Sequence, residues 1–172
     1  MSEVDDGREL ADLADAHGEI RGLLLGWLEA VVVGDSQEAR ARFDSFDALL
    51  RAHAAMEEEF LLPRFVELGL ETLGCSAAIL LAEHAKIRRH LDRSRAEQPP
   101  AGAPIAPGER VNLVLGSRDL RELLEHHDRR ERAGFFPALD AALAPSERAA
   151  LYEICARSQS SAAAREAKPP SS

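Results

Sequence analysis

The sequence predicts an all-α protein: an antiparallel up-down-up-down four-helix bundle with a short fifth helix at the C-terminal end. Three observations support this fold class. Of the 172 residues, 45% are hydrophobic and only 5% are aromatic, and the helix-favouring residues Ala, Leu, Arg and Glu dominate. Apolar residues recur at three- and four-residue spacing through most of the chain, which is typical of amphipathic helices. Four long helical segments joined by turns pack most simply as a bundle, and no alternating strand pattern occurs.

The first two helices are predicted to meet at the turn 34–36. The first helix begins near Leu10 and carries its apolar residues on one stripe up to this turn. The second helix starts there, with Asp35 or Ser36 as its N-cap. It is expected to end within residues 63–69, which contain a proline and a glycine.

The remaining segments follow the same reasoning. The third helix is predicted over residues 76–97, and the proline-rich stretch 98–108 is a long connection because it cannot form regular helix. The fourth helix is predicted over residues 109–134 and the fifth over residues 145–157. We therefore expect a bundle domain over residues 1–158, followed by a disordered Ser-, Ala- and Pro-rich tail at 159–172.

Charge and composition restrict the possible partners and the compartment. A formal net charge of -9 argues against nucleic acid and anionic membranes, because phosphates require a basic surface. The most apolar run, residues 23–33, is shorter than the ~20 residues needed to span a bilayer. The N-terminal segment lacks a secretion-signal pattern, and Cys75 and Cys155 form no disulfide framework. These features predict a cytoplasmic protein with reduced cysteines.

Two eleven-residue blocks of the sequence are near copies of each other. Each has a histidine four residues before a glutamate, and a proline six residues after that glutamate: His53, Glu57 and Pro63 in one block, and His127, Glu131 and Pro137 in the other. On a helix, positions i and i+4 share one face, so each imidazole lies beside its carboxylate. Imidazole with carboxylate suits zinc, copper, iron or manganese better than calcium or magnesium.

Two further histidines, His17 and His84, lie at the same height in the predicted bundle. In an antiparallel hairpin, two residues are level only if they are equidistant from the turn. The midpoint of His17 and His53 is residue 35, that of Glu57 and His84 falls between 70 and 71, and that of His84 and His127 falls between 105 and 106. All three midpoints lie in predicted turns. A shift of seven residues would misplace a ligand by ~10 Å.

Buried mid-helix carboxylates require a compensating cation. Four histidines and two glutamates exceed the needs of one tetrahedral ion. Two ions would use all of them, with two histidines on each ion, both glutamates shared, and a solvent-derived oxygen between the metals. Carboxylate-bridged metals in helix bundles favour iron, with manganese second. The predicted metal ligands are therefore four imidazoles and two carboxylates: His17, His53, Glu57, His84, His127 and Glu131.

Other polar residues near the blocks leave alternatives open. His126 adjoins His127 but points ~100° away around the helix, so it is expected near the centre's edge or at the surface, with a role as rival ligand still open. His90 is turned away from the metal face. Glu58 and Glu125 are alternative carboxylates, although solvated flanking positions suit them better.

The sequence resembles the hemerythrin-like, HHE cation-binding domain family from about Leu10 to Pro137. The matching features are Ala-His17, the block that Leu-Leu-Pro63 closes, Glu83-His84 followed by Ile87, and the block that Phe-Phe-Pro137 closes. The resemblance implies a four-helix bundle with a non-haem di-iron site. It also implies O2, NO or peroxide chemistry, or iron sensing.

One departure from the family bears on activity. Respiratory hemerythrins carry a fifth histidine, and the candidate positions here hold Leu80 and Arg88. Both irons would then be coordinatively open, which weakens the expectation of an oxygen carrier. We expect a monomeric or homodimeric di-iron protein that binds or senses O2, NO or iron. The alternative is a di-iron oxidase, peroxidase or catalase-like enzyme, and a metal-free interaction bundle is a third hypothesis.

Overall fold

The computed structural model describes residues 9–166, and for residues 160–166 only the course of the helix. The described residues are almost entirely helical. They contain no β-strand, only one isolated β-bridge between Thr72 and Cys75. The all-α prediction is confirmed. In chain order the elements are η1 Leu10–Asp15, α1 Ala16–Val33, α2 Ser36–Met56, η2 Glu57–Leu61, α3 Leu62–Glu67, α4 Ala77–Ala96, α5 Pro107–Gly116, α6 Arg118–Arg130, η3 Glu131–Phe135, α7 Phe136–Ala142 and α8 Pro145–Glu166.

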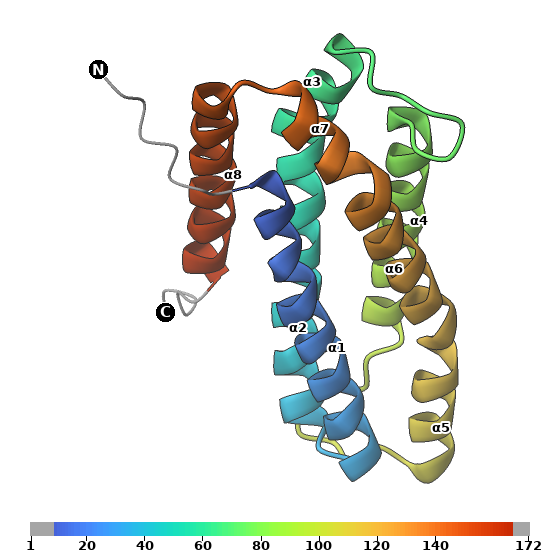
Figure 1. Ribbon diagram of the computed structural model, residues 1–172. Coiled ribbons are helices and arrows are strands. Elements are labelled where there is room, and N and C mark those ends of the chain that lie inside the picture. Colours follow the sequence, from blue (N-terminus) through green and yellow to red (C-terminus); the bar gives the residue numbers. More distant parts are fainter. Residues whose placement is uncertain (1–8, 167–172) are drawn as a thin grey trace.

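The helices form the predicted four-rod bundle (Figure 1). The first rod is η1 with α1, the second is α2 with η2 and α3, the third is α4, and the fourth runs from α5 through α7. Successive rods run in opposite directions. Helix α8 turns back after α7 and packs along α2 on the outside of the bundle.

The turns between the rods use the residues expected for them. Gly34 ends α1 with a φ of 91°, a left-handed conformation that glycine adopts without strain. The Asp35 side chain then caps α2 by accepting a hydrogen bond of 3.0 Å from the backbone N–H of Glu38. Ser76 caps α4 in the same way, through the backbone N–H of Ile79.

Both proline-containing blocks continue as helix through the proline, and the second rod then ends at Glu67, within the predicted range 63–69. Elements η2 and η3 are single π-helical turns. In η2 the N–H of Leu62 donates to the carbonyl of Glu57, and in η3 the N–H of Phe136 donates to the carbonyl of Glu131. A proline ring collides with the carbonyl four residues earlier in an α-helix. The wider turn just before each proline accommodates the ring, so the fourth rod extends to residue 142 and does not stop at residue 134.

Two other boundaries differ from the prediction. The fourth rod begins at Pro107 and is interrupted at Ser117, whose hydroxyl donates to the carbonyl of Val114. Helix α8 continues to Glu166, so the expected disordered tail is wrong for residues 159–166. Residues 167–172 lie outside the described part of the chain. Within residues 9–166, no helix combines the length and the apolar character needed to cross a lipid bilayer.

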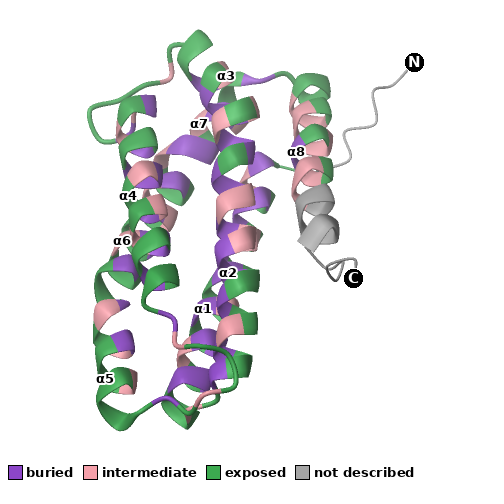
Figure 2. Cartoon of the chain, turned by 180° about the vertical axis from the view of Figure 1, so that it is seen from behind, coloured by how far each residue is buried: buried purple, intermediate pink, exposed green. Residues whose placement is uncertain are grey.

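Two apolar clusters fill the inside of the bundle, where buried residues line the facing sides of the rods (Figure 2). The upper cluster joins η1, α3, α4, α7 and α8 and includes Phe65 and Phe135, whose rings meet edge to face. The lower cluster joins α1, α2, α4, α5 and α6 and includes Trp27 and Phe43. The level between the two clusters is polar, and it holds the candidate site.

Candidate metal centre

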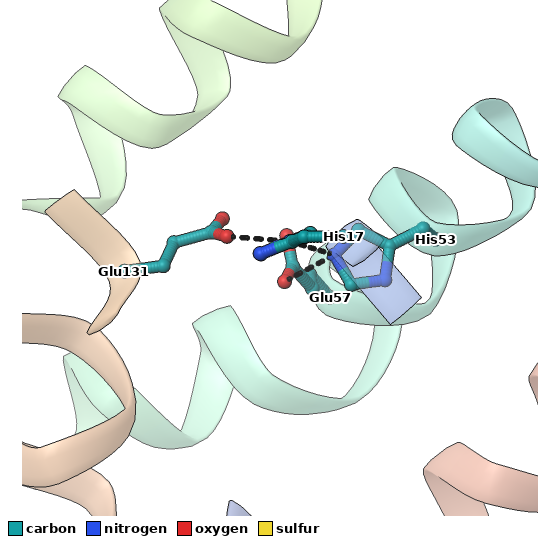
Figure 3. Close-up of side chains that lie close together, drawn as sticks. All are labelled: His17, His53, Glu57 and Glu131. Carbon is teal, nitrogen blue, oxygen red and sulfur yellow. Dashed lines mark hydrogen bonds and ion pairs between the residues drawn. The ribbon is translucent and has the colours of Figure 1, made fainter. Parts of the chain in front are cut away.

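Six buried side chains meet between the two apolar clusters, and they are the six that the sequence predicted. They form two groups that share Glu57 and Glu131. The first group adds His17 and His53, and we call it the α1/α2 position; Figure 3 shows its four residues. The second group adds His84 and His127, and we call it the α4/α6 position.

Each glutamate directs one oxygen to each position. Glu131 places Oε2 at 3.1 Å from His17 Nε2 and Oε1 at 2.8 Å from His127 Nε2. Glu57 places Oε1 at 3.1 Å from His53 Nε2 and Oε2 at 3.2 Å from His84 Nε2. Each of the two carboxylates therefore spans both positions.

All six side chains are shielded from solvent. Glu57, Glu131 and His84 are 0% exposed, and His17, the most accessible of the six, is 6% exposed. The apolar neighbours along each helix belong to the two clusters, so the polar level is closed above and below by hydrocarbon. An ionised carboxylate at this depth is unfavourable unless a cation neutralises it.

The four carboxylate oxygens have no hydrogen bond of acceptable geometry, although imidazole nitrogens lie within about 3 Å of each. The nitrogen–oxygen distances would allow hydrogen bonds, but the N–H bonds do not point at the oxygens, and a hydrogen bond depends on its angle. Nitrogen and oxygen lone pairs that converge in this way are arranged for a metal ion.

Three acidic side chains hold the outer nitrogens of three of the histidines. The Nδ1 atoms of His17, His84 and His127 donate to Asp128 at 2.5 Å, Glu58 at 2.9 Å and Glu83 at 3.0 Å, respectively. A proton on Nδ1 leaves the lone pair on Nε2, which is the tautomer that a metal ligand needs. Burial opposes the charged form of Asp128, but hydrogen bonds from Arg132 and His17 lower its pKa overall.

These acids follow a rule around the bundle. Each one adjoins a predicted ligand in the sequence but supports a histidine on the next rod. Glu58 follows Glu57 on the second rod and bonds His84 on the third. Glu83 precedes His84 and bonds His127, and Asp128 follows His127 and bonds His17 on the first rod. The acid follows its neighbouring ligand in the sequence on the second and fourth rods and precedes it on the third, which runs in the opposite direction.

In each imidazole pair the two Nε2 atoms approach each other, with the rings nearly perpendicular. His17 Nε2 lies 2.8 Å from His53 Nε2, and His84 Nε2 lies 3.1 Å from His127 Nε2. Two Nε2 lone pairs at such distances repel unless a cation lies between them. Burial lowers the pKa of His127, but the charges of Glu131, Glu83 and Glu57 outweigh it and raise that pKa to about 10. The cluster therefore attracts positive charge, whether as protons or as metal.

The alternative ligands stay outside the cluster. His126 is exposed, and His90 is half-buried beside Arg93. Glu125 is exposed on α6. Of the two positions considered for a fifth histidine, Leu80 packs in the upper apolar cluster, and Arg88 pairs with Glu58 at 2.9 Å.

Comparison with known families agrees with this geometry. The model of the hemerythrin HHE cation-binding domain matches residues 8–139, which includes all six side chains. The chain belongs to the hemerythrin HHE cation-binding domain family. No curated protein and no solved structure matches the chain significantly. A cation-binding domain of this family fits the buried imidazoles and carboxylates, which supply the nitrogen and oxygen donors that iron accepts.

Part of the polar network of this hemerythrin HHE domain was not predicted from the sequence. Asp128 and Gln159 had no predicted role, and Glu58 was expected as a solvated flanking residue or an alternative carboxylate. An acid beside each candidate ligand was a usable signal for Asp128, Glu58 and Glu83. No comparable signal existed for Gln159, which lies on α8 and contacts His53 Nδ1 at 2.9 Å.

Proposed function

We propose that this hemerythrin HHE domain is a non-haem di-iron protein that binds or senses O2 or NO. The four histidines and two glutamates of the centre would be the ligands, with two nitrogens and two oxygens at each position. The observation that carries the proposal is that both buried glutamates offer one oxygen to each imidazole pair while making no hydrogen bond. When bound, two ferrous ions supply electrons and Lewis acidity for a diatomic ligand.

The surroundings of the centre favour a small apolar ligand. A cavity of about 20 Å³ adjoins the α1/α2 position, and Ile20, Leu50 and Leu124 form its apolar wall beside His17 and His53. A space of this size accommodates about one water-sized molecule. It suits a diatomic gas.

The chain's own side chains have separable tasks in this proposal. His17, His53, His84 and His127 would each present Nε2 to a metal, and the supporting acids hold three of them in the required tautomer. Glu57 and Glu131 would hold the two ions at a fixed separation. The apolar clusters exclude bulk water, which strengthens the electrostatic attraction of these groups for cations.

A second function, di-iron oxidation chemistry with O2 or peroxide, is favoured by one specific observation. The two candidate positions for a fifth histidine hold Leu80, in the upper apolar cluster, and Arg88, which is engaged with Glu58, and neither offers a lone pair. Each position then has four protein donors, so both ions keep accessible coordination sites. Two accessible ions suit turnover better than storage of one ligand.

Anaerobic reconstitution with ferrous iron tests the first proposal. We expect two iron atoms per chain and a spectrum that appears with O2 or NO and disappears when the gas is removed. The variants His84→Ala and Glu131→Ala should lose both the metal and the spectrum, and His90→Ala is the control. Irreversible oxidation with oxygen evolution from peroxide would favour the enzyme, and a protein without bound iron would contradict both functions.

A further inference from the structure

Helix α8 contributes one polar side chain to the surroundings of the centre. The helix packs along α2, and Cys155 on its inner face is fully buried in the upper apolar cluster. Gln159 follows one turn later, so it lies on the same face. Its carboxamide nitrogen is 2.9 Å from Nδ1 of His53. The fifth helix therefore reaches a predicted ligand of the α1/α2 position directly.

This contact takes the place of a missing acid. The rule that runs around the bundle would require an acid beside His17, on the first rod, to support His53 on the second. The neighbours of His17 are Ala16 and Gly18, and neither carries a polar side chain. His53 is the one histidine of the four whose outer nitrogen faces a carboxamide and not a carboxylate.

A carboxamide and a carboxylate act differently on an imidazole. An ionised carboxylate can only accept, so it keeps the proton on Nδ1 and raises the basicity of Nε2 toward a metal. A carboxamide presents an N–H donor in one orientation and an oxygen acceptor after a flip of 180°, so it satisfies either tautomer. To support a metal on Nε2 of His53, Gln159 must present its oxygen, and it adds no negative charge.

We propose that Gln159 is a positioning residue for His53, and that its carboxamide makes the α1/α2 position the weaker of the two metal positions. The inference rests on the proposed di-metal centre. At the α4/α6 position, carboxylates support both histidines, Glu58 for His84 and Glu83 for His127. At the α1/α2 position, Asp128 supports one histidine and Gln159 the other.

Titration of the metal-free full chain with Co(II), followed by its visible absorption, tests the proposal. We expect two binding steps of different affinity. His53→Ala should remove the weaker step, and His84→Ala should remove the tighter one. Gln159→Leu should weaken the weaker step by roughly 10- to 100-fold, the usual effect of losing such a partner, and change the absorption of that step alone. Gln159→Glu restores an acceptor with a charge and should tighten it beyond wild type.

Two controls separate positioning from a general effect on the fold. Arg157→Leu changes an exposed residue of the same helix and should leave both steps unchanged. In the His53→Ala background, Gln159→Leu should have no further effect, because its partner is gone. Reaction of Cys155 with a thiol reagent, in a Cys75→Ala background, reports whether α8 stays docked; it should stay slow in Gln159→Leu.

The outcomes are distinguishable. A wild-type protein that binds no Co(II) overturns the proposed function and this inference together. Two steps that are equal in the wild type, or unchanged in Gln159→Leu and Gln159→Glu, overturn the inference and leave the function standing. Equal weakening of the step by both substitutions also overturns it, because the hydrogen bond would then not be the cause.

Discussion

The carboxylate of Asp128 accepts a hydrogen bond of 2.5 Å from Nδ1 of His17, although the two residues lie on different rods of the bundle. Asp128 is itself held by Arg21 at 2.7 Å and by Arg132 at 2.7 Å. Two arginine side chains therefore hold the acid in place. An acid fixed in this way orients the imidazole and sets its tautomer.

Asp128→Asn should weaken metal binding without unfolding the protein. The carboxamide no longer enforces a proton on Nδ1 of His17, so we expect roughly 10- to 100-fold weaker binding at the α1/α2 position. Titration with Co(II) measures the change, and circular dichroism checks the fold. Glu125→Gln, an exposed acid on the same helix, is the matched control. Equal effects of the two substitutions would show that Asp128 has no special role.

Metal should stabilise the folded chain, and the effect should depend on Glu57. Metal at 100 times its dissociation constant adds about 2.7 kcal/mol per site to the free energy of unfolding, roughly 5–10 °C in a domain of this size. Glu57→Ala should abolish the increase, because this carboxylate faces both positions. Glu59→Ala, an exposed neighbour two residues along the chain, should retain it. Thermal unfolding with and without a chelator makes the comparison. A melting temperature that is unchanged by the chelator would support the hypothesis of a metal-free interaction bundle.

The metal-free protein should lose stability as the pH rises through the alkaline range. Burial opposes a charge on His127, but the carboxylates of Glu131, Glu83 and Glu57 outweigh it and raise the pKa of His127 to about 10, against an ordinary value near 6.5. A pKa raised by folding contributes stability that is complete below the ordinary value and lost as the pH approaches the folded value. The free energy of unfolding should therefore fall between about pH 6.5 and 10, by at most ~1.4 kcal/mol per pH unit for this one proton.

Urea titrations at a series of pH values measure that slope. His127→Gln cannot take up the proton, so the slope should shrink in this variant. The metal-loaded protein should show little slope over the same range, because the metal would replace the proton as the positive charge near Glu131. A metal-free protein that becomes more stable with rising pH would contradict the assignment of positive charge to the cluster.

Both cysteines should resist thiol reagents in the native protein. Cys75 is 4% exposed and Cys155 is 0% exposed. Burial and the nearby charge of Glu57 raise the pKa of the Cys155 thiol to about 12, so little reactive thiolate forms at neutral pH. A colorimetric thiol reagent should label neither residue within minutes and both in denaturant. Rapid labelling of Cys155 would mean that α8 does not stay packed on α2.

The sequence could predict that the six candidate ligands lie together, because their positions follow helical geometry. The spacing of His53 from Glu57 places both groups on one face, and equal distances from a turn place His17 and His53 at one height. Both properties depend on the rise and twist of an α-helix, which every helix shares. The boundaries at the turn 34–36 were predictable for a similar reason, since glycine and an N-cap acid end and start helices locally.

The π-turns, and the length and docking of α8, were not predictable in this way. The fourth helix was expected to end at residue 134, but a wider turn of five residues accommodates the ring of Pro137 and carries the rod to residue 142. Helix α8 has only a weak amphipathic pattern, so the sequence does not predict its length. Its packing on α2 depends on which face of the four-rod bundle is left uncovered. Only the folded chain shows that it brings Gln159 to His53.

The sequence by itself determined the helical class, the heights of six polar side chains and the identity of their donor atoms, because these follow from residue type and from one repeating geometry. The tertiary structure decided which oxygen faces which imidazole, and which partner holds each outer nitrogen. Those contacts join separate rods, so they depend on the distance and rotation between helices. Packing of the whole core sets both quantities, and no local stretch of residues contains them.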